Sequence, residues 1–328
     1  MSSFCECLKS NFCTCNPPVS GAVIEKCGLS NNYAEKLLRF LENKITGGQR
    51  TYGFEYEFIS ARPLDLDTMK RIYRFLPETG FIKNSNSFLH ESGMYIDFEP
   101  GGQIEFHSPP LLSGSSDAFN RYIFLIEKTI DEIRAALDIE YIPAGYIPGR
   151  EDSPLCLDAE RYLNLHSRLL TSSTRGLEMM KGTASIHFHA GIMDIEELPW
   201  LFSRLAGIAE MEDFKMGKER RDIWDNTDPD RCGQPFKVDS RDTPLQLMEK
   251  IADHAVHAEH IGENRPFFKT GDLSFDAFMY HLTTIFTDIR INVKGPSIEL
   301  RTIDSVPFDR FTSKWNKFIT MLENNQQD

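Results

Sequence analysis

The sequence predicts an α+β fold in which a β-sheet packs one face on helices. Two observations support this prediction. Short segments bounded by glycine or proline alternate between apolar and ionisable residues, as strands with one buried face do. Longer segments between them repeat apolar residues at helical spacing, which indicates amphipathic helices.

The alternating segments share an unusual polar face. Glutamate, histidine and arginine dominate it, and lysine is nearly absent. A face that is merely solvated usually mixes lysine, serine, threonine and glutamate, so we interpret this one as functional, with simple solvation as the alternative. The segments are residues 53–58, 103–107, 185–189, 288–291 and 298–301.

Four segments predict helices. Ser30 offers an N-cap for a helix that ends before Gly47-Gly48. The other three helices are expected over residues 116–138, 195–209 and 244–259.

The chain is expected to hold one catalytic domain, residues 29–328, preceded by a flexible, cysteine-rich tail, residues 1–28. The tail carries two Cys-x-Cys pairs, Cys5/Cys7 and Cys13/Cys15. Their spacing differs from the usual Cys-x₂-Cys ligand pairs, so a mobile thiol-bearing tail is favoured over a soft-metal site.

Charge and composition exclude several classes of protein. A formal net charge of −13 argues against nucleic-acid and anionic-membrane partners, which need a basic surface. No apolar run is long enough for a transmembrane helix, and no secretory signal is apparent. With an odd count of seven cysteines, these features predict reduced thiols and a cytoplasmic location.

If the strands are neighbours, their glutamates converge into a candidate metal site. Crowded carboxylates repel one another and raise each other's pKa, which a divalent cation relieves. Carboxylate oxygens suit Mg²⁺, which often shares its ligand shell with substrate phosphates. The candidate ligands are Glu55, Glu57, Glu105 and Glu299, with Glu99 and His187 as additions and His189 nearby.

Arginines on the same face predict phosphate chemistry. Arg290 and Arg301 could stabilise a transferring phosphoryl group, or each could pair with a glutamate as a structural ion pair. Phosphate-loop, nucleophile-elbow, dinucleotide-binding and zinc-protease motifs are missing from the sequence. A second charged segment with Arg220, Trp224 and Arg231 would suit a loop that holds a small zwitterion, or it is a surface loop.

Several of these segments resemble the glutamate–cysteine ligase family of the plant and proteobacterial type. The sequence FEPGGQIEF at 98–106 is similar to that family's LEPGGQ-x-E-L segment. Further similar segments are GFEYE at 53–57, residues 161–162 and 176–180, residues 220–233, HLTTIFTDIR at 281–290 and IELRTID at 298–304.

The resemblance implies a glutamine-synthetase-like antiparallel sheet and an ATP- and Mg²⁺-dependent carboxylate–amine ligase with an acyl-phosphate intermediate. It implies glutamate and cysteine as substrates, a role in glutathione biosynthesis, and substrate binding by Arg220, Trp224 and Arg231. Lys181 stands where plant-type members have arginine and is the fourth expected substrate-binding residue. The strand at 185–191 resembles the His-x-His-x-Gly strand of other carboxylate–amine ligases. The chain is also shorter than typical members. Alternatives are another acid and amine pair, a phosphotransferase, or a non-catalytic nucleotide-binding module on the same fold.

Overall fold

The computed structural model describes residues 21–85, 87–172 and 175–324. Among them, the protein is α+β with a large antiparallel sheet, as the sequence predicts. The two Cys-x-Cys pairs lie outside the described residues. No described helix combines the length and the apolar character that crossing a lipid bilayer requires.

The main sheet contains every strand that the alternating segments predict, and each neighbouring pair is antiparallel. Two short strands, β6 (Leu111–Leu112) and β7 (Tyr141–Ile142), also pair with β1. Across the sheet the order is β11 (Ile289–Asn292), β12 (Ser297–Asp304), β8 (Ser185–Gly191), β1 (Thr51–Ser60), β5 (Ile104–His107), β4 (Tyr95–Phe98), β3 (Ser87–Leu89) and β2 (Ile82–Asn84).

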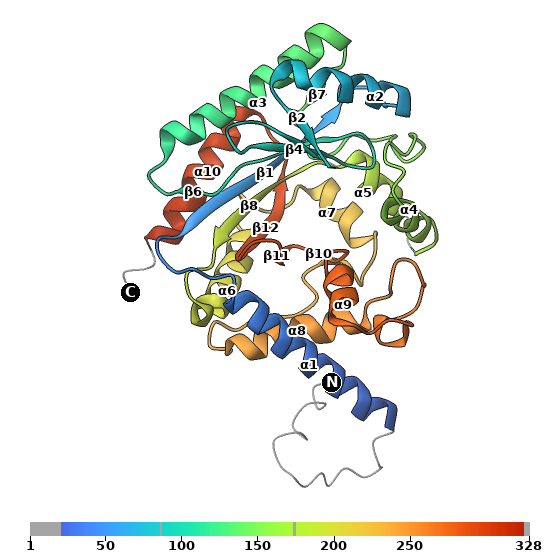
Figure 1. The fold of residues 1–328 in the computed structure, drawn as a ribbon, viewed down its shortest axis with the longest axis vertical. Coiled ribbons are helices and arrows are strands. Elements are labelled where there is room, and N and C mark those ends of the chain that lie inside the picture. Colours follow the sequence, from blue (N-terminus) through green and yellow to red (C-terminus); the bar gives the residue numbers. More distant parts are fainter. Residues whose placement is uncertain (1–20, 86, 173–174, 325–328) are drawn as a thin grey trace.

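One face of the sheet packs on α3 (Ser116–Leu137) and α10 (Phe308–Glu323), with α2 (Leu66–Phe75) beside them (Figure 1). The apolar residues of β1 and β8 point to this side. Phe54 contacts Phe311 and Trp315 edge-on, with ring centroids 5.1 and 5.6 Å apart, and Phe188 contacts Trp315. Burial of these large rings supplies the main stabilisation of this layer.

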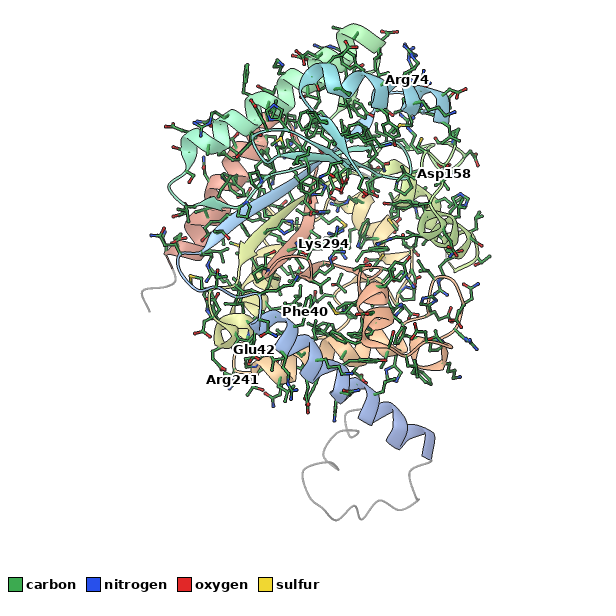
Figure 2. The ribbon with its side chains drawn as sticks, in the orientation of Figure 1. Phe40, Glu42, Arg74, Asp158, Arg241 and Lys294 are labelled. Carbon is green, nitrogen blue, oxygen red and sulfur yellow. The ribbon has the colours of Figure 1, made fainter. Side chains whose placement is uncertain are left out.

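The prediction that helices pack on one face is incomplete, because further helices lie on the other side of the sheet (Figure 1). Side chains fill the space between this layer and the sheet (Figure 2). A second apolar cluster, which includes Leu169, Met180 and Ile223, holds part of this layer together. The layer contains α1 (Gly21–Glu42), α4 (Glu160–Ser172), α5 (Gly176–Gly182), α7 (Lys218–Asp225), α8 (Pro244–His257) and α9 (Phe275–Leu282).

The remaining elements are short or lie at the sheet margin. A parallel pair joins β9 (Cys232–Gly233) to β10 (Phe286–Thr287). The 3₁₀ turns are η2 (Leu76–Thr79), η3 (Ile195–Glu197) and η4 (Phe267–Lys269), and α6 (Leu198–Ala209) packs near β11 and β12.

Two helix predictions need correction. The first helix begins at Gly21, so residues 21–28 are helical rather than tail, and Ser30 is a buried residue inside the helix instead of its N-cap. Packing of α1 against α8 supports the longer helix. Residues 218–225 form α7 and not a loop, although the following residues 226–231 are turns. The helices predicted over 116–138 and 244–259 are confirmed within about two residues at each end. In the segment predicted as a helix over 195–209, the α-helix begins three residues later, at Leu198, after the 3₁₀ turn η3.

Candidate metal and phosphate site

The register of three strands brings the predicted acidic residues together. Strand β1 lies between β5 and β8, so Glu55 is opposite His107 on one side and His187 on the other. Two residues along, Glu57 is opposite Glu105. Because side chains alternate across a strand, all of these point to the face away from α3 and α10.

Three overlapping sets of ligand atoms occur on this face. Within each set, one oxygen or nitrogen per residue lies within 4.8 Å of the others. Glu55 belongs to two of the sets and Glu105 to two, so they are the residues that the candidate positions share. The sets are Glu55–Glu105–His107, Glu55–His189–Glu299 and Glu57–Glu105–His187.

The charges at this cluster are mutually dependent. Burial opposes the charge of Glu55, but the neighbouring His189 and His107 imidazoles and a hydrogen bond with His187 hold its pKa well below the usual value. Burial raises the pKa of Glu105, and the nearby Glu55 and Glu57 carboxylates add to that shift. Burial opposes the charge of His107, yet Glu105 and Glu55 raise its pKa well above normal.

Several buried nitrogens at the cluster lack a hydrogen-bond partner among the described residues. These are both ring nitrogens of His107 and Nε2 of His189. His107 Nε2 is 3.0 Å from Glu105 Oε2, and His189 Nε2 is 3.3 Å from Glu55 Oε1. Buried polar atoms are normally hydrogen-bonded, so imidazole nitrogens that face carboxylates without a well-formed hydrogen bond are a donor set that fits a divalent cation.

His187 is held from two sides. Its Nδ1 is hydrogen-bonded to Glu55, and its Nε2 shares a hydrogen bond of 2.7 Å with the Ser185 hydroxyl. Burial lowers the pKa of His187 to about 4, and the neighbouring Arg301 adds to the shift. A neutral imidazole in a fixed orientation is the form that ligates metals.

Both predicted catalytic arginines reach this cluster through Glu299. Arg290 donates to Glu299 Oε2 from Nε at 2.9 Å, and Arg301 donates to the same oxygen at 2.8 Å. Arg301 also lies 3.3 Å from Nδ1 of His187. The structural ion pairs weighed as the alternative are therefore present, and they place both guanidinium groups at the edge of the candidate metal site.

Glu99 stands apart from the three ligand sets. Burial raises its pKa well above normal, and the charges of Glu105 and Glu57 raise it further. His107 was missing from the predicted ligands, and His189 was predicted only to lie near them. In the structure each of the two histidines belongs to a ligand set. The alternation of Gln103, Glu105 and His107 along one strand was the available signal for His107.

The four predicted substrate-binding residues all contact other groups of the protein. Arg220 donates to Asp304 Oδ1 at 3.0 Å and lies over the Trp224 ring, and Arg231 donates to Asp228 Oδ2 at 2.8 Å. Lys181 donates to the backbone carbonyls of residues 151 and 153, at 2.8 and 2.7 Å. Their role toward a substrate remains a prediction.

Arg161, on α4, has a different environment. It donates to the Thr283 carbonyl at 2.9 Å and to the Thr283 hydroxyl at 3.2 Å, and no carboxylate among the described residues lies within ion-pair distance of it. Its charge opposes the rise in the pKa of Glu99, so it lies on the acidic side of the sheet. In the sequence, Arg161 belongs to a segment of the family resemblance, residues 161–162, but no role was predicted for it.

Close packing against the backbone of Lys181 requires a glycine at position 101. A Cβ on Gly101 would lie 2.6 Å from both the Cα and the carbonyl oxygen of Lys181, and Gln103 Nε2 donates to the Thr183 carbonyl at 3.0 Å. We expect Gly101→Ala to lower the free energy of unfolding by about 1–3 kcal/mol, because backbone atoms cannot move aside. Urea unfolding measures this. Gly114→Ala, where a Cβ has open space, is the control, and equal effects of the two changes would contradict the steric argument.

Comparisons with known proteins add no family assignment. The chain matches no protein-family model, and no curated protein is significantly similar to it in sequence.

Proposed function

We propose that the chain is an ATP-dependent, Mg²⁺-requiring carboxylate–amine ligase on a glutamine-synthetase-like sheet. One observation carries the proposal. Carboxylates and imidazoles from β1, β5, β8 and β12 form overlapping divalent-cation sets, and two arginines border them. Acidic ligands beside guanidinium groups can hold a metal-bound nucleotide and stabilise the charge of a transferring phosphoryl group.

In the proposed reaction, a carboxylate oxygen attacks the γ-phosphorus of ATP and ADP leaves. The amine nitrogen then attacks the acyl-phosphate carbon, loses a proton, and inorganic phosphate departs. The sum is acid, amine and ATP converted to amide, ADP and phosphate. Glutamate and cysteine are the first pair to test, because the motif resemblance points to them.

The residues present divide the work. Glu55, Glu57, Glu105, Glu299 and the three histidines would hold divalent cations, which neutralise phosphate charge when bound. Arg290 and Arg301, oriented by Glu299, offer guanidinium donors at the edge of the cluster. Arg161 is the candidate for binding a substrate carboxylate, because no carboxylate of the described residues lies within ion-pair distance of its guanidinium group, which donates only to Thr283.

The test is a panel assay. The protein is incubated with ATP, Mg²⁺ and pairs drawn from amino acids and amines, and ADP, phosphate and products are measured by mass spectrometry. We expect equimolar ADP, phosphate and an amide with at least one pair. A stable phosphorylated product without phosphate release would indicate a phosphotransferase. Binding of Mg-ATP without turnover for every pair would indicate a non-catalytic module. Either result would contradict the ligase proposal.

A further inference from the structure

Strand β12 is irregular at the residues that face the candidate metal site. Its pairing with β8 advances three residues along β12, from Leu300 to Ile303, while it advances only two along β8. Arg301 and Thr302 therefore stand together opposite the single residue His187. One extra residue in a strand of an antiparallel pair is a β-bulge, which changes the direction of side chains and often occurs beside active sites.

The bulge determines which side chains of β12 lie on the polar face of the sheet. In a regular strand Ile303 would follow Glu299 and Arg301 on that face, because residues two apart share a face. With the extra residue, Ile303 is buried in the core, and Asp304 lies opposite Ser185 on the polar side. The bulge thus allows two charged residues, Arg301 and Asp304, to share the face of the metal cluster at a spacing of three.

Arg220, on α7, holds this bulge from the polar side of the sheet, where α7 lies near β12 (Figure 1). Its guanidinium group donates to the carbonyl of Arg301 at 3.0 Å, to the carbonyl of Thr302 at 3.2 Å and to Asp304 Oδ1 at 3.0 Å. A bulge interrupts the ladder between strands, so its carbonyls need other donors. A planar guanidinium group can serve several acceptors at once, and Arg220 does so while only 2% exposed.

The beginning of α7 is fitted to the same part of β12. The amide of its N-cap residue, Gly217, donates to Asp304 Oδ2 at 3.2 Å, and a Cβ on Gly217 would lie 2.2 Å from that oxygen. Asp304 therefore accepts from Gly217 with one oxygen and from Arg220 with the other. These contacts join α7 to both ends of the bulged segment.

Arg301 extends from the bulge to the candidate metal site. Its Nη1 lies 2.8 Å from Glu299 Oε2 and 3.3 Å from His187 Nδ1, and its backbone amide donates to the Asp288 carbonyl at 2.9 Å. We propose that Arg220 is a positioning residue, which clamps the bulge so that the Arg301 guanidinium group faces phosphates bound at the cluster. The inference rests on the proposed function, and it replaces the substrate-binding role that the motif resemblance implies for Arg220.

A double-mutant cycle tests the coupling between the two arginines. Titration calorimetry measures the affinity for Mg-ATP of the unchanged protein, Arg220→Gln, Arg301→Gln and the double variant. We expect each single variant to lose about tenfold in affinity, and the double variant to lose no more than about twofold beyond Arg301→Gln, because Arg220 acts through Arg301. A loss caused only by a destabilised fold would appear equally in both backgrounds.

Hydrogen exchange tests the clamp without a nucleotide. Residues 297–304 should exchange about tenfold faster in Arg220→Gln than in the unchanged protein, while β1 stays protected. Arg150→Gln is the matched control, because Arg150 is also a buried arginine that donates to two backbone carbonyls, those of Ser60 and Ala61. It should change neither the exchange of residues 297–304 nor the affinity for Mg-ATP.

Additive losses in the double variant would overturn the proposal, and so would an unchanged affinity for Mg-ATP with a raised KM for the acid or the amine. Unchanged exchange of residues 297–304 in Arg220→Gln would overturn it as well. If Arg220→Gln does not fold, Arg220→Lys takes its place in both measurements, because lysine keeps the charge but lacks the planar fork. If the unchanged protein binds no Mg-ATP, the proposed function fails, and hydrogen exchange alone decides whether Arg220 holds the bulge.

Discussion

Glu55→Gln is expected to reduce amide formation by about a thousandfold, because it removes one charge from two of the three ligand sets at once. Glutamine keeps the shape of the side chain, so the strand should pair as before. Glu55 also contacts His107, His187 and His189, and its carboxylate is the one that all three imidazoles share. Initial rates measured against Mg²⁺ concentration test this prediction. The Mg²⁺ concentration that gives half of the maximal rate should be much higher for the variant than for the unchanged protein.

The melting temperature tests the role of Glu55 in metal binding without any measurement of turnover. A cation that binds only the folded protein raises its melting temperature by mass action, and a chelator should reverse the increase. We expect this Mg²⁺-dependent shift in the unchanged protein and its loss in Glu55→Gln. Glu91→Gln, an exposed residue outside the cluster, is the control. A Glu55→Gln variant with normal rates and a normal Mg²⁺ response would refute the metal site.

Arg231→Gln is expected to lower the free energy of unfolding by about 3 kcal/mol. Arg231 is fully buried, donates to Asp228 at 2.8 Å and also donates to the Glu259 carbonyl. Asp228 is equally buried and keeps only Arg168, at 3.1 Å, as a cationic partner in the variant. The loss therefore leaves a buried carboxylate less well compensated. Urea unfolding at neutral pH measures it.

The pH dependence of the Arg231→Gln effect has a definite sign. Burial opposes the charge of Asp228, but Arg168 and Arg231 hold its pKa below the usual value. The ion pair therefore stabilises the fold above pH about 3.9, and this contribution is lost as the pH falls through the lowered pKa. The difference in free energy of unfolding between Arg231→Gln and the unchanged protein should therefore become smaller at acidic pH.

Arg134→Gln is the control for Arg231→Gln. It breaks an exposed ion pair with Asp131 and should change the free energy of unfolding by less than about 1 kcal/mol.

Arg231→Gln also tests the substrate-binding role that the motif resemblance predicts for Arg231. Unchanged stability together with a raised KM for the acid or amine would show that Arg231 binds substrate and not the core.

The sequence alone predicted correctly which side chains of each strand lie on the polar face of the sheet. Alternation along β1, β5, β8 and β12 is a local consequence of backbone geometry, so Glu55, Glu57, Glu105 and Glu299 were predicted on one face without knowledge of strand order. The helices at 116–138 and 244–259 followed from periodicity for the same reason. The family, the substrates and the nucleotide remain predictions from motif resemblance.

The arrangement between strands was decided by the tertiary structure. Pairing of β1 with β5 and β8 brings Glu55 between His107 and His187, which are 52 and 132 residues away along the chain. Register and ion pairing depend on distant packing, and no local pattern reveals that Arg220 and Arg231 are neutralised by Asp304 and Asp228. The sequence by itself therefore determined which side chains share a strand face. Tertiary packing decided which of them meet, because contacts between strands are non-local.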